Sequence, residues 1–158
     1  MHFKQTKNYG CGVYSISNSL QLDDFITNKK LTLSKNGNNV GQLNKWLSNY
    51  GIKCFVSCIA YNNEEIVKIF DLKPIFITEN IIEWVPFFIT IKSNEKRSHM
   101  IGCRYMNDGR IIAHDSMKEK EDVYDNFNEF KEKYESKVVA FELLRNYQNE
   151  AIFMKLNN

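Results

Sequence analysis

Apolar residues recur at helical spacing in the first half of the chain. Val13, Ile16 and Leu20 are three and four residues apart, which predicts a helix over 11–22. The same spacing predicts further helices over 40–50, 63–70 and 123–135. Asn39 is placed to cap the second of these helices, because asparagine is favoured at helix N-termini.

From residue 74 onward the pattern changes to short runs of β-branched and aromatic residues. These runs predict strands over 74–78, 86–91, 98–106, 110–115, 137–144 and 151–156, after an earlier strand over 52–60. Helices followed by antiparallel strands predict an α+β fold rather than a doubly wound parallel sheet. We therefore expect N-terminal helices packed on a C-terminal antiparallel sheet.

The length of one hairpin loop decides which side chains share a face of that sheet. If Asn107-Asp108-Gly109 forms a three-residue loop, Met106 pairs with Arg110. Asp115 then lies on the same face as His99, at a diagonal offset of about 7–8 Å. A two-residue loop would shift the register by one and move Asp115 to the opposite face. His114 points away from His99 in the three-residue register, so it is the poorer candidate for chemistry.

The composition fits one globular domain over residues 1–158. Of these residues, 43% are hydrophobic and 13% aromatic, which excludes a disordered chain. The net charge is +2: residues 1–60 carry seven basic and two acidic side chains, and residues 61–158 carry fourteen and seventeen. This mild asymmetry favours a solvated surface over a nucleic-acid interface. No apolar run approaches the roughly 20 residues of a membrane span.

The four cysteines are too few and too scattered for a secreted disulfide framework. Since the first residues also lack an apolar signal stretch, we expect a reduced, cytoplasmic location. Cys54 and Cys58 are four residues apart in a predicted strand, about 13 Å, which is too far for a disulfide or a shared zinc. We expect both of them, and Cys103, to be core residues, and we expect no metal or other cofactor.

The remaining cysteine, Cys11, begins a predicted helix between Gly10 and Gly12. The positive end of the helix dipole favours a thiolate at such a position. A buried apolar cysteine is the alternative. The amide of Gln5, six residues earlier, is suited to donate to an oxyanion together with the backbone N–H of Cys11.

His99 begins a predicted strand after a polar segment, so its ring can reach a cleft, although a lone histidine there would as readily be a surface residue. Asp115 ends the partner strand sixteen residues later. With Cys11 they supply a nucleophile, a base and a residue that orients the base. His99 would take the thiol proton or rest as imidazolium beside a thiolate, and Asp115 would fix its tautomer.

These residues and spacings resemble the bacteriocin-processing, double-glycine-leader cysteine peptidases, which belong to the papain-like superfamily. The resemblance covers two blocks. The first, residues 5–20, contains Gln5-x5-Cys11-Gly12. The second, residues 98–116, contains a histidine opening a strand, a glycine-containing turn and a strand ending in aspartate.

The resemblance implies a papain-like fold, a catalytic triad of Cys11, His99 and Asp115, and Gln5 as the oxyanion residue. The chain departs from the family pattern at residues next to Cys11 and Asp115. Tyr9-Gly10 precedes the cysteine where the family often has Asp or Glu, and Ser116-Met117 follows Asp115 where it often has Pro.

We therefore expect a cysteine peptidase that hydrolyses a peptide bond in a peptide or protein substrate. Two alternatives remain open at this point. One is a catalytically silent peptide-binding module of the same fold, and the other is an acyltransferase or deamidase that uses the same triad. The sequence identifies neither the substrate nor the oligomeric state.

Overall fold

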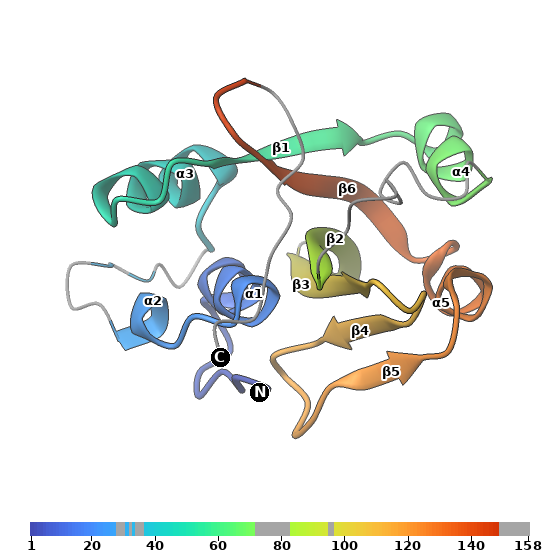
Figure 1. Ribbon diagram of the computed structural model, residues 1–158, viewed down its shortest axis with the longest axis horizontal. Helices are drawn as coiled ribbons and strands as arrows, with labels where there is room; N and C mark the ends of the chain where they lie inside the picture. The colour runs from blue at the N-terminus through green and yellow to red at the C-terminus, as the bar shows by residue number, and fades with distance from the viewer. Residues whose placement is uncertain (28–30, 32, 34–36, 72–82, 95–96, 149–158) are drawn as a thin grey trace.

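A computed structural model describes residues 1–27, 31, 33, 37–71, 83–94 and 97–148 (Figure 1). The elements in chain order are α1 (Cys11–Leu20), α2 (Asp24–Thr27), α3 (Val40–Asn49), β1 (Phe55–Ala60), α4 (Asn63–Asp71), β2 (Trp84–Asn94), β3 (Arg97–Met106), β4 (Ile111–His114), β5 (Asp122–Tyr124), α5 (Phe127–Tyr134) and β6 (Val138–Arg145). The strands predicted over 74–78 and 151–156 lie outside the described residues.

The strands form one six-stranded sheet in the order β1-β6-β2-β3-β4-β5. Every neighbouring pair is antiparallel, which confirms the predicted α+β class. The sheet is not confined to the C-terminal half, however, because β1 from the first half pairs with β6 at one edge. Figure 1 shows the helices divided between the two sides of this sheet, with α1, α2 and α3 on one side and α4 and α5 on the other.

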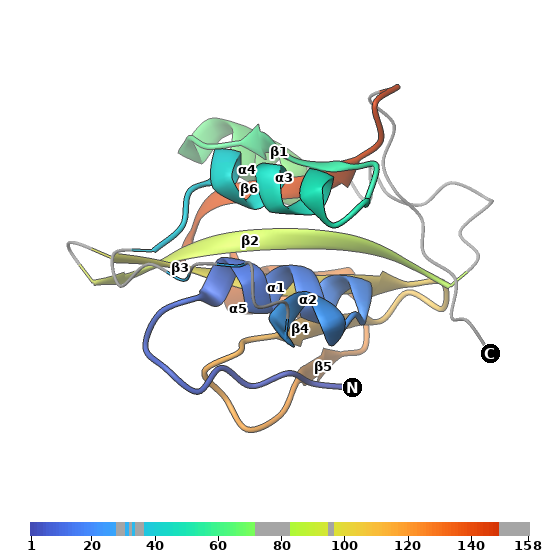
Figure 2. The same ribbon diagram turned by 90° about the vertical axis from the view of Figure 1, so that its left-hand side faces the viewer.

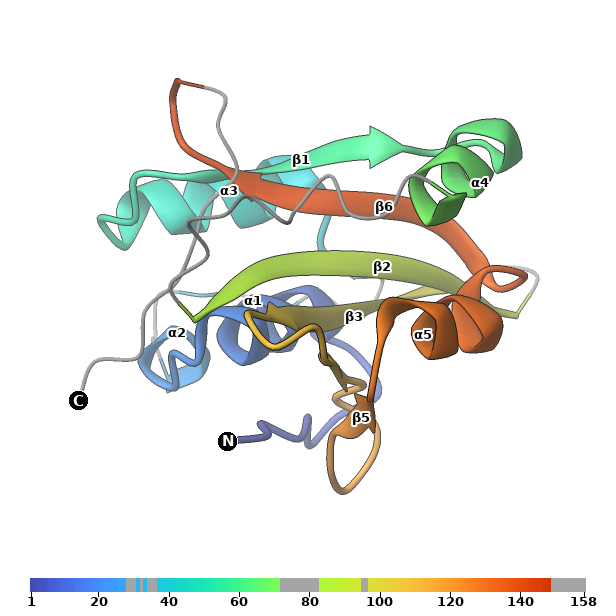
Figure 3. The same cartoon turned by 45° about the vertical axis from the view of Figure 1, so that its right-hand side comes forward.

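Each face of the sheet carries its own hydrophobic core. Figure 2 shows α1, α2 and α3 over one face, where Ile16 and Leu47 are buried with Phe88 of β2. Figure 3 shows α4 and α5 over the other face, where Phe130 packs with Phe87. Phe87 and Phe88 are adjacent in sequence, and both are fully buried because successive residues of a strand point to opposite faces.

Helix α1 is held against the sheet by small polar side chains as well as by its apolar residues. The buried hydroxyl of Ser15 donates to the backbone oxygen of Met100 at 2.8 Å, and that of Ser19 donates to Phe87 O at 3.3 Å. Short side chains allow the helix to lie close to β2 and β3. The helix that begins with Cys11 therefore packs directly on the strand that contains His99.

The hairpin between β3 and β4 has the three-residue loop on which the sequence argument depended. Gly102 pairs with His114, and Met106 N donates to Arg110 O at 2.9 Å. Gly109 closes the loop with φ +92°, a left-handed conformation that favours glycine. The predicted register is confirmed.

The helix predicted over 123–135 is wrong at its start. Val123 lies in β5, pairs with Ile112 and is 52% exposed instead of facing a core. The helix begins only at Phe127, because the side chain of Asn126 accepts a hydrogen bond from Glu129 N at 3.0 Å and caps it. Asn39 caps α3 in the same way, as predicted.

The prediction that three cysteines belong to the core is right for two of them. Cys54 and Cys103 are buried, whereas Cys58 is exposed. Cys58 lies on β1 at the edge of the sheet, where its partner on β6 is the charged residue Glu142. All four cysteines carry free thiols, and a cytoplasmic location stays a prediction. No helix in the described ranges has the length and apolar character needed to cross a membrane.

Candidate active site

Cys11 is the first residue of α1, as predicted. Gly10 precedes it with φ +97°, and Gly10 O accepts a hydrogen bond from Tyr14 N at 3.2 Å in the first turn. This left-handed conformation favours glycine, which explains the residue type before the cysteine. The Cys11 thiol is thus held at the positive end of a ten-residue helix, partly buried at the wall of a cavity.

His99 and Asp115 form a direct side-chain pair. His99 Nε2 lies 2.7 Å from Asp115 Oδ1, and the two side chains are only 13% and 16% exposed. Asp115 Oδ1 also accepts a hydrogen bond from Met117 N at 3.0 Å. Burial alone would raise the pKa of Asp115. The hydrogen bond and charge of His99, together with the Met117 N–H, outweigh burial and lower this pKa below its ordinary value. Asp115 is therefore an ionised carboxylate that orients the ring.

Cys11 and His99 interact through their side chains, since His99 has the largest lowering influence on the pKa of the Cys11 thiol. Because Nε2 of the ring is held by Asp115, Nδ1 is the nitrogen left for the thiol. Burial tends to raise the pKa of Cys11, yet the interaction with His99 and the backbone groups of Met100 and Gly12 lower it below its ordinary value. Burial tends to lower the pKa of His99, but Asp115 and then Cys11 raise it to about 9. Both shifts favour a thiolate beside an imidazolium.

Gln5 is buried and attached to the segment that follows Asp115. Its backbone N–H donates to Ser116 O at 2.8 Å, and its Oε1 accepts from Ser116 Oγ at 2.5 Å. Its Nε2 donates to Lys7 O at 2.7 Å, which leaves the second N–H of the amide for another acceptor. Gln5 thereby ties the loop before Cys11 to the end of β4. Its role as an oxyanion donor stays a prediction.

His114 points to the opposite face of the sheet from His99 and Asp115, in agreement with the predicted register. Its buried ring accepts a hydrogen bond from Arg104 Nε at 3.1 Å and stacks on His2. Burial, followed by the charge of Arg104, lowers the pKa of His114 to about 3. A neutral ring in these contacts has a packing role and no base function.

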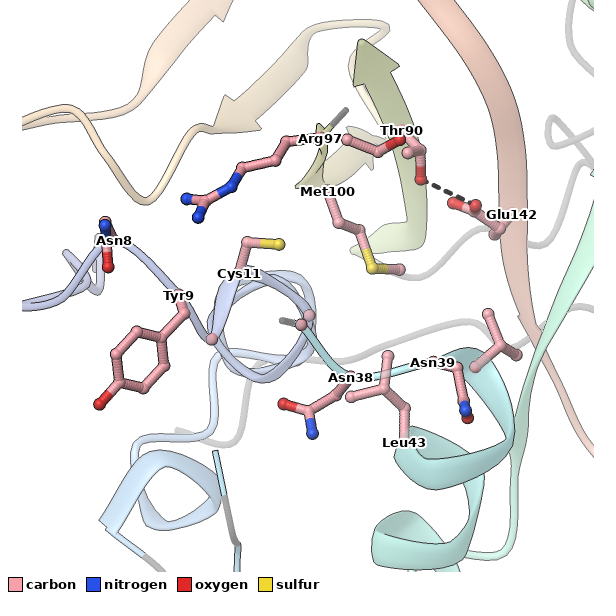
Figure 4. A pocket seen from close by; sticks show the side chains of 15 residues that line it. Asn8, Tyr9, Cys11, Asn38, Asn39, Leu43, Thr90, Arg97, Met100 and Glu142 are labelled. Atoms are coloured by element: carbon pink, nitrogen blue, oxygen red, sulfur yellow. Dashed lines mark hydrogen bonds between the residues drawn. The ribbon is translucent and has the colours of Figure 1, made fainter. Parts of the chain in front are cut away.

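A cavity of about 690 Å³ opens beside Cys11 (Figure 4). It is lined by the loop before α1, the start of α3, and strands β2, β3 and β6. Figure 4 shows the Cys11 sulfur near Met100, with Arg97 on one side of Cys11 and Glu142 with Thr90 on the other.

The cavity residues Arg97, Thr90 and Glu142 are not among the site residues predicted from the sequence. A signal for Glu142 was present, since a carboxylate interrupts the apolar run over 140–144 of a predicted strand. A charged residue at such a position is almost never buried without a reason. Arg97 and Thr90 carry no comparable signal, because both residue types are ordinary at strand ends and on exposed strand faces.

The arrangement supplies, in one row, a nucleophilic thiolate at a cavity wall, a proton donor that interacts with it and an ionised carboxylate hydrogen-bonded to that donor. Such a row can attack an electrophilic carbonyl carbon and protonate a leaving group. In the ranges described above, no group of three or more His, Cys, Asp or Glu side chains is placed to hold a metal ion.

Comparison with known proteins provides no assignment of family. No protein-family model matches this chain, and no curated protein matches its sequence. The assignment of a function therefore rests on the side chains described above.

Proposed function

We propose that this protein is a cysteine peptidase with a papain-like fold, in which Cys11 is the nucleophile, His99 the acid–base group and Asp115 the residue that orients it. The observation that carries the proposal is the placement of Cys11 at the cavity wall, where its thiol interacts with His99 and the His99 ring is hydrogen-bonded to Asp115 at 2.7 Å. A nucleophile helix packed on an antiparallel sheet that positions the histidine and aspartate supports the papain-like assignment.

In the first half of the reaction, the Cys11 thiolate attacks the carbonyl carbon of the scissile peptide bond and forms a C–S bond. The carbonyl electron pair moves to oxygen, where the backbone N–H of Cys11 at the helix N-terminus and the Gln5 amide are the candidate donors. As the C–O double bond reforms, the C–N bond breaks. The leaving amine takes the proton of the His99 imidazolium, and an acyl-thioester remains on Cys11.

In the second half, neutral His99 removes a proton from water as the water oxygen attacks the thioester carbon. The tetrahedral species collapses with cleavage of the C–S bond. The products are a carboxylic acid and the regenerated thiolate–imidazolium pair. Asp115 remains ionised throughout and holds the ring in the required orientation.

The alternatives share the first half of this reaction and differ in the product. A deamidase would release ammonia from a side-chain amide, and an acyltransferase would pass the acyl group to an amine instead of water. A silent binding module would need no reactive thiol. The lowered pKa of Cys11 favours a reactive thiol, and therefore an enzyme.

The test is to incubate the purified protein with a peptide library and to identify products by mass spectrometry, with Cys11→Ala as the control. We expect cleaved peptides with the wild-type protein and none with the variant. Products that keep the peptide bond but lose ammonia or gain an acceptor would assign the deamidase or the transferase. Intact peptides, together with wild-type and Cys11→Ala proteins labelled equally by iodoacetamide, would overturn the nucleophile assignment.

A further inference from the structure

The cavity beside Cys11 contains a buried carboxylate that the proposed reaction does not use. Glu142 on β6 is 4% exposed, and its Oε1 accepts a hydrogen bond from Thr90 Oγ1 of β2 at 2.9 Å. Both residues line the same cavity as Cys11. The two side chains reach the cavity from neighbouring antiparallel strands, because Thr90 and Glu142 lie on one face of the paired β2 and β6.

The other oxygen of this carboxylate is unsatisfied. In the described part of the chain, Glu142 Oε2 is buried and has no hydrogen-bond partner. Burial raises the pKa of Glu142 to about 7, and only the Thr90 hydroxyl opposes that rise. A buried carboxylate without a full set of partners is costly, so it requires a physical reason, of which a bound ligand or counter-ion is one.

The one cationic side chain in the described lining of this cavity is directed elsewhere. Arg97 lines the same cavity, but Figure 4 shows its side chain running toward Asn8, on the far side of Cys11 from Glu142. In the same view, the Glu142 carboxylate lies beside Thr90 and faces the space occupied by Met100. Methionine is a flexible, adaptable side chain, so it can yield to an entering group.

We propose that Glu142 and Thr90 form an acidic subsite of the Cys11 cavity, which selects a peptide by binding a positively charged N–H donor of that peptide. The donor is the ammonium or guanidinium of a lysine or arginine side chain, or the N-terminal ammonium of the peptide. Glu142 Oε2 accepts from it, and Thr90 holds the carboxylate in place through Oε1. This proposal rests on the proposed function, because it assigns a substrate class to the same cavity.

The first test measures cleavage. Hexapeptides with acetylated N-termini and amidated C-termini carry a single lysine at successive positions, and a matched set carries norleucine instead. We expect the wild-type protein to prefer lysine at one position by about tenfold to a hundredfold, the range of one charge-assisted hydrogen bond. In Glu142→Gln, which keeps the side-chain size and an acceptor for Thr90, this preference should disappear. Glu132→Gln removes an exposed carboxylate on α5, across the sheet, and should retain it.

A second test measures binding and needs no catalysis. The Cys11→Ala protein is titrated with the same peptides by calorimetry, alone and combined with Glu142→Gln or Glu132→Gln. We expect tighter binding of one lysine peptide than of its norleucine partner, abolished only by Glu142→Gln. A third peptide set with free N-termini and no lysine separates the two sources of the cation. A gain in affinity from the free N-terminus alone would assign the subsite to the peptide's own ammonium.

The two tests separate the subsite from the peptidase activity. Cleavage that depends on Cys11 but shows no Glu142-dependent preference would overturn the subsite and leave the peptidase. Absence of cleavage, with Glu142-dependent binding of cationic peptides, would overturn the peptidase and retain the subsite. Equal binding of all capped and uncapped peptides by the Cys11→Ala protein with and without Glu142→Gln would remove the subsite altogether.

Discussion

Gly102 on β3 lies directly against the backbone of Ser15 on α1. A Cβ atom added to Gly102 would be 2.3 Å from Ser15 O and 2.7 Å from Ser19 Oγ. Contacts this short do not occur between real atoms of these types, so only glycine permits the observed separation of helix and strand. Since Cys11 begins the helix and His99 is three residues before Gly102 in sequence, this contact sets how the nucleophile and its base meet.

The first prediction concerns that contact. Gly102→Ala should lower the free energy of unfolding by about 2 kcal/mol, because the added methyl group pushes against backbone that cannot turn aside. It should also slow labelling of Cys11 by iodoacetamide, because the thiol moves away from His99. Denaturant unfolding and mass spectrometry measure the two effects.

Gly41→Ala is the matched control for this substitution. A Cβ atom at Gly41 meets only the side-chain oxygen of Asn39, at 3.3 Å. Gly41 lies inside α3, so alanine there should leave stability unchanged or raise it slightly. A Gly102→Ala protein as stable and as reactive as wild type would show that α1 does not lie this close to β3.

A second prediction follows from the opposing influences on the Cys11 thiol. Burial raises its pKa, and His99 with the backbone groups of Met100 and Gly12 lowers it below the ordinary value of 9.0. In His99→Ala the burial remains while the largest lowering influence is lost, so the pKa should move upward. The iodoacetamide labelling rate of Cys11 should then reach its midpoint at higher pH than in wild type.

Cys58 serves as an internal reference in the same experiment. Cys58 is exposed, but its thiol is still partly desolvated, and this partial burial, followed by the charge of Glu142, raises its pKa. Its labelling should therefore have a midpoint above that of Cys11 in wild type, and the His99 substitution should leave it unchanged. Identical profiles for Cys11 in the two proteins would contradict the interaction between Cys11 and His99.

A third prediction concerns the upper pH limit of activity. Burial lowers the pKa of His99, but Asp115 and Cys11 raise it to about 9, so the imidazolium should persist up to that pH and activity should fall above it. Asp115→Asn removes the negative charge but keeps the size. The pKa of His99 should then fall toward 6.5, the limit should move to lower pH, and the maximal rate should drop about a hundredfold.

The pH–rate profile of peptide cleavage checks this, together with NMR titration of the His99 ring. Asp125→Asn, at an exposed position outside the cavity, is the control and should keep the wild-type profile. An Asp115→Asn protein whose His99 still titrates near pH 9 would show that the carboxylate does not stabilise the imidazolium.

Much of this site could be predicted because it depends on local signals and one register. Gly10 and Cys11 mark a helix start, and the Asn107–Gly109 loop fixes the pairing that places Asp115 on the face of His99. These are short-range features, because residues adjacent in sequence determine them. That register brings the side chains of His99 and Asp115 within reach of each other, and the structure shows them hydrogen-bonded at 2.7 Å.

The parts that failed depend on contacts between segments distant in sequence. No sequence pattern around Glu142 indicates that Thr90, fifty-two residues earlier, lies beside it. Val123 has a residue type that suits either a helix or a strand, and its pairing with Ile112 decided the outcome. Cys58 was expected in the core, but it lies on the edge strand β1 and its partner on β6 is Glu142.

The last prediction concerns folding stability and the buried carboxylate of Glu142. Its pKa is about 7 in the folded protein, since burial disfavours the charged form, against an ordinary value of 4.5. The folded state therefore binds more protons than the unfolded state between these values. Stability should accordingly fall as pH rises from about 4.5 through 7, by at most about 3 kcal/mol from this group.

Glu142→Gln should remove this loss, because the amide is neutral at every pH and still accepts from Thr90. The difference in unfolding free energy, variant minus wild type, should be small at pH 4.5 and increase toward pH 8. Among the described residues, the thiols of Cys58 and Cys103 have pKa values that burial, and then the charge of Glu142, raise above 9.0, so they stay neutral in this range. Denaturant unfolding at a series of pH values measures the difference, and Glu132→Gln should show no such trend. A difference that is flat with pH would mean that Glu142 is solvated in the folded protein, and the cavity would then have no desolvated anion to offer a cationic peptide.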